Sequence, residues 1–191
     1  YVNFRRYSVR YDLEANTFSI FYDGMGEIVR QAGVREIVSK REPQVGLQEY
    51  GKPTVSIARE DTAVTMTVTY SGAEMVRQDV SLNFRLEKGG VTLFVGGEGT
   101  ASVRFAGLTH WGDHDQRNTM AVNLHGAGRS LRSAYGPAAS IFDNALFDRD
   151  TDSAVIFETA GEFRLRYDWE KECYGFTLDT RGWDFARAFH V

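Results

Sequence analysis

Apolar and polar side chains alternate along much of the chain, with the period of two that is typical of a β-strand with one buried face. The clearest example lies between residues 76 and 86, where polar residues separate the apolar residues Val76, Val80, Leu82, Phe84 and Leu86. Residues 63–70 and 162–169 repeat this pattern. Shorter candidate strands begin at Thr17, Thr54, Val91, Ala101, Ser153 and Tyr174.

Turn-forming residues separate these stretches at "YDG" (22–24), "EKGG" (87–90) and "DRDTDS" (148–153). Such spacing favours an all-β fold, and we predict one two-layer antiparallel β-sandwich over residues 1–191 with at most one or two short helices. The candidate helix is 137–146, where apolar residues recur at helical spacing behind a proline that can begin a helix. These residues are Pro137, Ala138, Ile141, Phe142, Ala145 and Leu146.

Composition narrows the possible partners. The 191 residues are 42% hydrophobic and 25% charged, as in an ordinary globular domain, and the first is Tyr1, which agrees with a processed protein or an excised domain. A net charge of -4 offers no broad basic surface, so we expect neither nucleic acid nor a membrane as partner. Cys173 is the single cysteine, which excludes an intrachain disulfide and a cysteine-based zinc site.

The alternation breaks between Gly112 and Ser140, where "MAVNL" (120–124) is the one strand-like stretch. Long irregular connections in a compact domain are usually functional or disordered. Trp111, Leu124 and Tyr135 offer apolar anchors that favour an ordered segment. Because loops on a rigid scaffold commonly carry binding residues, we expect any ligand contact here.

Metal chemistry is weakly supported in this region. His110, Asp113, His114 and His125 carry suitable ligand atoms, but their spacing does not bring them together without a sharp bend. We therefore expect no metal and no other cofactor.

Two further motifs fail on spacing. Asp148, Asp150 and Asp152 resemble a calcium loop, yet Ser153 replaces the turn glycine and Glu158 falls one position short of the closing glutamate. We predict a hairpin turn there instead. Serines near His125 lack the G-x-S-x-G elbow of a nucleophile, and we assign no catalytic residue.

Two tryptophans suit a carbohydrate ligand. Trp111 and Trp183 are each followed closely by an aspartate, which combines a flat apolar face with hydrogen-bonding groups, although a core position is the alternative for each. The candidate carbohydrate contacts are Trp111, Asp113, His114, Asp115 and Arg129. The aromatic residues near the end of the chain form either an interdomain contact or a last strand that packs inward: Trp183, Phe185 and Phe189.

Two segments carry a resemblance to a known family. "VRYDLEANTFSIFYDG" (9–24) and "SIFDNALFDRDTDSAVIFETAGEFRLRYDW" (140–169) resemble the N-terminal β-sandwich of α-galactosidase and raffinose-synthase-like glycoside hydrolases, a supersandwich of the galactose-mutarotase type. The resemblance implies a catalytic barrel, in the same chain or a neighbouring subunit, that holds the catalytic carboxylates. A barrel needs about 250 residues, so this chain cannot contain one.

Two functional hypotheses follow. The first is a noncatalytic β-sandwich domain of a glycoside hydrolase-like protein, which contacts carbohydrate, for example a galactoside, or packs against the barrel. The alternative is a small stand-alone sugar-active enzyme, an epimerase or a metal-dependent lyase or isomerase, that uses His114 or His125 for proton transfer.

Overall fold

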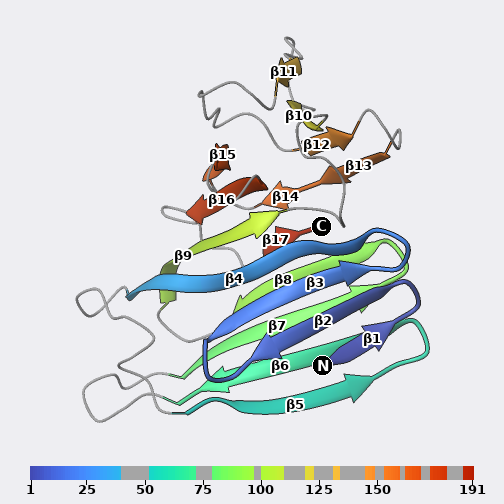
Figure 1. Ribbon diagram of the computed structural model, residues 1–191. Coiled ribbons are helices and arrows are strands. Elements are labelled where there is room, and N and C mark those ends of the chain that lie inside the picture. The colour runs from blue at the N-terminus through green and yellow to red at the C-terminus, as the bar shows by residue number, and fades with distance from the viewer. Residues whose placement is uncertain are drawn as a thin grey trace.

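The structure is a computed structural model that describes residues 1–39, 52–71, 79–96, 100–109, 119–122, 131–133, 145–148, 153–159, 162–168, 173–179 and 187–191 (Figure 1). All regular secondary structure in these segments is β-strand. No helix that could cross a membrane occurs among them.

The strands of the described segments form three antiparallel sheets. The seven-stranded sheet has the spatial order β1 (Val2–Phe4), β2 (Tyr7–Asp12), β3 (Thr17–Tyr22), β4 (Gly26–Ser39), β9 (Thr100–Thr109), β16 (Cys173–Asp179) and β15 (Glu162–Asp168). The six-stranded sheet has the order β14 (Glu158–Thr159), β17 (Arg187–His190), β8 (Gly90–Gly96), β7 (Val80–Glu87), β6 (Ala63–Tyr70) and β5 (Thr54–Arg59). A four-stranded sheet consists of β11 (Leu131–Ser133), β10 (Thr119–Val122), β12 (Ala145–Asp148) and β13 (Ser153–Ile156).

The two larger sheets pack face to face, with β1 to β4 lying over β5 to β8 (Figure 1). Their inner faces meet through aromatic contacts such as that of Phe18 in β3 with Phe84 in β7, whose ring centroids are 4.8 Å apart. Both rings are buried. The predicted all-β, two-layer antiparallel sandwich is therefore confirmed.

Strict alternation predicted the central strands well. In β6 and β7 every second side chain is buried, and the core residues of this sheet include Met66, Val68, Leu82, Phe84 and Leu86. The intervening side chains of β7 are on the outer face of the sheet. One of them, Arg85, forms salt bridges from Nη2 to Oε2 of Glu60 at 3.1 Å and from Nε to Oε1 of Glu87 at 2.7 Å. Alternation works here because one face of the sheet meets the core and the other meets solvent.

Strand β4 is the longest strand, and alternation does not predict it. Its register against β3 shifts between Phe18 and Ile20 and again between Ile20 and Phe21, and its register against β9 shifts as well. Gln31, at the first of these irregularities, has a φ of 49°, and Ile28 and Val29 are buried in succession. Each β-bulge inserts one extra residue into the strand and thereby shifts the alternation of buried and exposed side chains by one position. A bulged strand therefore shows no continuous alternation of apolar and polar residues in its sequence.

The candidate helix 137–146 is wrong where the structure describes it. Ala145 and Leu146 begin β12, which pairs with both β10 and β13, and residues 137–144 lie outside the described segments. Both side chains are buried, and a strand paired on both sides and covered by the core lacks a polar face that would distinguish it from a helix. The predicted hairpin at 148–153 is confirmed, because Asp148 pairs with Ser153.

Candidate functional site

The predicted carbohydrate contacts Trp111, Asp113, His114, Asp115 and Arg129 lie outside the described residues, as does His125 of the alternative hypothesis. The structure does describe where the first segment is attached. Strand β9 ends at Thr109 and β10 begins at Thr119, so residues 110–118 connect the seven-stranded sheet to the four-stranded sheet.

The predicted interdomain residues are partly placed. Phe189 lies in β17, where its backbone pairs with Thr159 of β14 on one side and Leu93 of β8 on the other. Trp183 and Phe185 lie outside the described residues. The prediction of an interdomain contact remains a prediction for all three. Groups of three or more metal-ligating side chains do not occur in the part of the chain that the structure describes.

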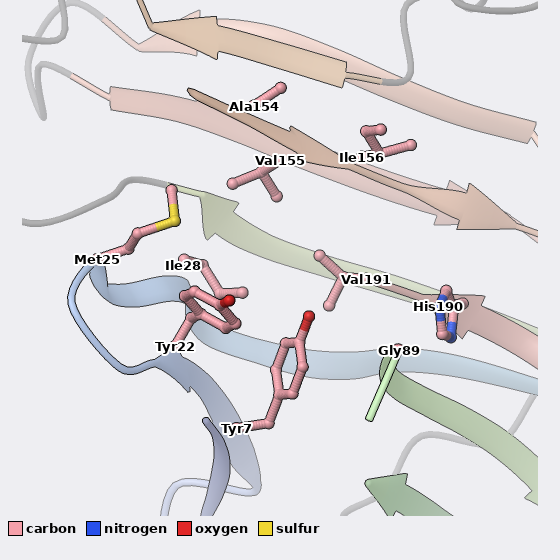
Figure 2. A pocket seen from close by; sticks show the side chains of 10 residues that line it. All are labelled: Tyr7, Tyr22, Met25, Ile28, Gly89, Ala154, Val155, Ile156, His190 and Val191. Atoms are coloured by element: carbon pink, nitrogen blue, oxygen red, sulfur yellow. The ribbon is translucent and has the colours of Figure 1, made fainter. Parts of the chain in front are cut away.

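The described residues line a pocket of about 400 Å³, partly open to solvent, to which all three sheets contribute and which is here called the three-sheet pocket (Figure 2). The seven-stranded sheet contributes Tyr7, Tyr22 and Ile28, with Met25 in the turn between β3 and β4. The remaining lining residues come from β13, from the turn between β7 and β8, and from the last residues of the chain: Ala154, Val155, Ile156, Gly89, His190 and Val191.

Tyr7 and Tyr22 form the floor of this pocket. They are direct partners in the β2–β3 register, and their rings meet edge to face with centroids 4.9 Å apart. Figure 2 shows both hydroxyl groups directed into the pocket. Burial raises the pKa of Tyr7 above its ordinary value of 10.0, with a further contribution from Tyr22. A tyrosine hydroxyl is protonated at neutral pH and can donate a hydrogen bond.

The backbone and charged neighbours hold Tyr22 in place. The Arg6 guanidinium lies over its ring, with Cζ 4.5 Å from the ring centroid, and donates a hydrogen bond from Nη2 to the carbonyl oxygen of Asp23 at 2.9 Å. The Asp23 amide in turn donates to the Arg6 carbonyl at 2.8 Å. These contacts fix the ring before any ligand arrives.

His190 lies at the other side of the pocket. Its Nδ1 is 2.6 Å from Oγ1 of Thr92, a buried side chain of β8. The chain next to it is fixed by two backbone hydrogen bonds between Val191 and Val91, at 2.8 and 3.0 Å. The imidazole is therefore oriented by the six-stranded sheet.

The side chains of the lining are apolar or polar, and only that of His190 can become cationic. None of its ten residues is Asp, Glu, Lys or Arg. A pair of carboxylates, which hydrolysis of a glycoside generally requires, is thus missing from this pocket. The pocket combines Met25, Ile28 and Val155 as apolar surface with two phenols and an imidazole that can form hydrogen bonds.

The pocket lies close to the start of the predicted carbohydrate segment. Ile28 lines the pocket, and its neighbour Val29 pairs with Thr109, the last residue of β9. Sequence reasoning did not find this pocket, because its residues come from five separate stretches of the chain. One signal was present in the sequence: Tyr7 and Tyr22 lie at matching distances on either side of a short turn, which pairs such residues across the two strands of a hairpin.

Comparison with known proteins shows the fold. No protein-family model matches the sequence, and no curated protein matches it. Two solved structures of the α-N-acetylgalactosaminidase NagBb from Bifidobacterium bifidum, a quadruple mutant and a GalNAc complex, are similar with TM-scores of 0.63 and 0.61 at 12% identity. Each match covers 99% of this chain and 35% of the NagBb chain. This chain therefore has the fold of one portion of a glycoside hydrolase and spans about a third of its length.

Proposed function

We propose that this chain is a noncatalytic β-sandwich domain of a glycoside hydrolase-like protein, of the α-galactosidase and raffinose-synthase type. One observation carries the proposal: nearly the whole chain, 99%, corresponds in fold to 35% of a glycoside hydrolase. A domain that matches a minor part of an enzyme over its full length is expected to act beside a catalytic domain.

The strand content of the described residues and the residues of the three-sheet pocket both support a noncatalytic role. Strands of three sheets occupy most of the described residues, whereas a catalytic barrel by itself needs about 250 residues. The three-sheet pocket also lacks the two carboxylates that would cleave a glycosidic bond.

Two contributions of such a domain are proposed. Trp183, Phe185 and Phe189 pack against a catalytic barrel, in the same chain or in a neighbouring subunit. Trp111, Asp113, His114, Asp115 and Arg129 contact a carbohydrate, for example a galactoside. The second role is supported by the attachment of residues 110–118 to β9, an interior strand of the seven-stranded sheet, because rigid strands position binding loops well.

The catalytic part of the proposal is tested with the 191-residue chain and nitrophenyl α-galactoside and α-N-acetylgalactosaminide. We expect no turnover, and the coding sequence beyond Val191 should continue into a barrel. Turnover by the purified chain would overturn the proposal. Proton exchange on an aldose that disappears in His114→Ala or His125→Ala would instead establish the stand-alone enzyme.

The carbohydrate contact is tested by calorimetric titration with galactosides. Trp111→Ala should abolish the heat of binding assigned to this segment, whereas Trp111→Phe, which keeps an aromatic face, should retain most of it. Binding that is unchanged in Trp111→Ala rejects these residues as the contact.

A further inference from the structure

We propose that the three-sheet pocket binds a neutral, hydroxyl-bearing ring of monosaccharide size, a pyranose. The inference stands on the geometry of the pocket and does not depend on the likeness to a hydrolase. It concerns residues separate from the proposed contacts at 111–129, so the two proposals succeed or fail independently.

Size and charge select the ligand class. A volume of about 400 Å³ lies toward the lower end of the range of roughly 300–1,000 Å³ found for small-molecule sites. The lining offers no Asp, Glu, Lys or Arg side chain to balance an ionic ligand. A cation would lose hydration without gaining a counter-charge from a side chain of the lining, and only His190 could balance an anion, so a neutral ligand is favoured.

The hydroxyl groups of Tyr7 and Tyr22 select a polar ligand over a hydrocarbon. Neither hydroxyl is hydrogen-bonded to another residue in the described segments, and both point into the pocket (Figure 2). Each phenol can donate one hydrogen bond and accept another. Two adjacent sugar hydroxyls would satisfy both phenols, which a lipid chain or a benzene ring cannot do.

The apolar side of the pocket suits the C–H face of a sugar ring. Met25, Ile28, Val155 and Val191 line the pocket together with the two tyrosines (Figure 2). Aromatic and aliphatic surfaces pack against the C–H groups of a pyranose while its hydroxyls remain free to bond.

The polar groups are held in place by contacts outside the pocket. Tyr22 is fixed by Arg6 and by Tyr7, and His190 is fixed by Thr92 at 2.6 Å. Groups that are already oriented lose little conformational freedom on binding, which is the condition for affinity toward a small ligand.

The test is a titration of the isotopically labelled 191-residue chain with methyl α-galactopyranoside and N-acetylgalactosamine, followed by amide chemical shifts. We expect the largest shifts at Tyr7, Tyr22, Val155 and His190. A shift map confined to residues 110–129, or no shifts at millimolar sugar, would overturn the proposal. Cyclohexanol is the comparison ligand: binding as tight as that of the pyranoside would also overturn it, because an apolar ring would then suffice.

The double variant Tyr7→Phe/Tyr22→Phe keeps both rings and removes both hydroxyls, and we expect it to weaken pyranoside binding at least tenfold. The matched control is Tyr1→Phe, the same chemical change at a side chain that is 71% exposed and does not line the pocket. Unchanged affinity in the double variant, with binding lost in Trp111→Ala, would assign the sugar to the other segment and reject the pocket.

A second variant blocks the pocket without touching the tyrosines. A Cβ at Gly89 meets no atom within 4 Å, so Gly89→Phe places a ring next to the pocket. The control is Leu13→Phe, which adds a ring at an exposed side chain outside the pocket. We expect Gly89→Phe to abolish binding and Leu13→Phe to preserve it, with both variants folded as judged by circular dichroism. Full binding by folded Gly89→Phe contradicts the proposal.

Discussion

The imidazole of His190 occupies the space that a side chain at Gly90 would need. A Cβ added to Gly90 would lie 2.7 Å from both Cε1 and Nε2 of His190 and 2.6 Å from the Val191 carbonyl oxygen. Gly90 also has a φ of +150°, a conformation that side chains rarely adopt. The glycine at the start of β8 therefore allows the last strand to approach closely and sets the position of His190 at the pocket.

Gly90→Ala should destabilise the protein, because the new methyl group displaces His190 or the paired backbone of Val191. We expect a loss of about 1–3 kcal/mol in the free energy of unfolding, measured by urea denaturation. Gly89→Ala is the control, since its Cβ lies in open space, and it should change stability by less than about 1 kcal/mol. Equal effects at the two positions would contradict the close approach.

The contact between Phe18 and Phe84 allows the packing of the two large sheets to be tested by mutation. A double-mutant cycle with Phe18→Leu and Phe84→Leu should give a coupling energy of about 0.5–1.5 kcal/mol, as expected for an edge-to-face pair. Phe84→Ala alone should cost about 3–5 kcal/mol because the side chain is fully buried. Ile57→Ala, at a side chain 46% exposed on the edge strand β5, should cost much less. A coupling energy of zero would mean that the sheets are not packed as described.

Alkaline pH should destabilise the fold through ionisation of Tyr11 and Tyr70, which form a hydrogen-bonded group with Asn16. The Tyr11 and Tyr70 hydroxyls are hydrogen-bonded to each other, and Tyr70 donates to Oδ1 of Asn16 at 2.8 Å. Burial is the main cause that raises the pKa of both tyrosines above 10.0, and for Tyr11 the hydrogen bond to Tyr70 adds to it. The folded state then keeps protons that the unfolded chain releases, so the contribution of these two tyrosines to stability is constant below about pH 10 and falls as pH rises further.

This pH dependence is measured as the free energy of unfolding from pH 7 to 11. Tyr11→Phe/Tyr70→Phe should flatten the decline above pH 10, whereas Tyr1→Phe, at an exposed site, should leave it unchanged. An identical decline in the double variant would show that these two tyrosines do not carry the effect.

Close packing at Gly107 provides a further test, in the interior strand β9. A Cβ there would lie 2.7 Å from Cβ of Ala32 and 2.9 Å from Cε1 of Phe176, on the neighbouring strands β4 and β16. Gly107→Val should cost about 1–3 kcal/mol through overpacking, as seen in thermal and urea denaturation. If Gly107→Val is as stable as the unmodified chain, the bulged part of β4 around Ala32 can move away from the new side chain.

Several parts of the fold follow from sequence because each depends on local chemistry. The alternation of β6 and β7 and the turn between Asp148 and Ser153 need little more than a half-buried surface and a short polar loop. Strand β12 was instead expected to be the end of a helix. Ala145 and Leu146 fit either structure locally, and their pairing with β10 and β13 decides between the two.

The candidate functional residues also fall into two groups, one that the sequence predicted and one that only the structure showed. Residues 110–115 stood out in the sequence because Trp111 and its acidic neighbours are adjacent in the chain, whereas the pocket residues Tyr7, Val155 and His190 are not. No local sequence pattern predicts a group of side chains that come together from three different sheets. Only a pairing such as that of Tyr7 with Tyr22 leaves a trace in the hairpin sequence.

Sequence alone determined the class of the fold, since the period-two burial of apolar side chains is compatible with sheets that have one dry face. Tertiary structure decided where β4 bulges, that β17 lies between β8 and β14, and that Tyr22 and His190 line one pocket. These features depend on contacts between residues far apart in the chain, whose energies come from packing and backbone pairing between strands, and no short stretch of sequence contains both partners.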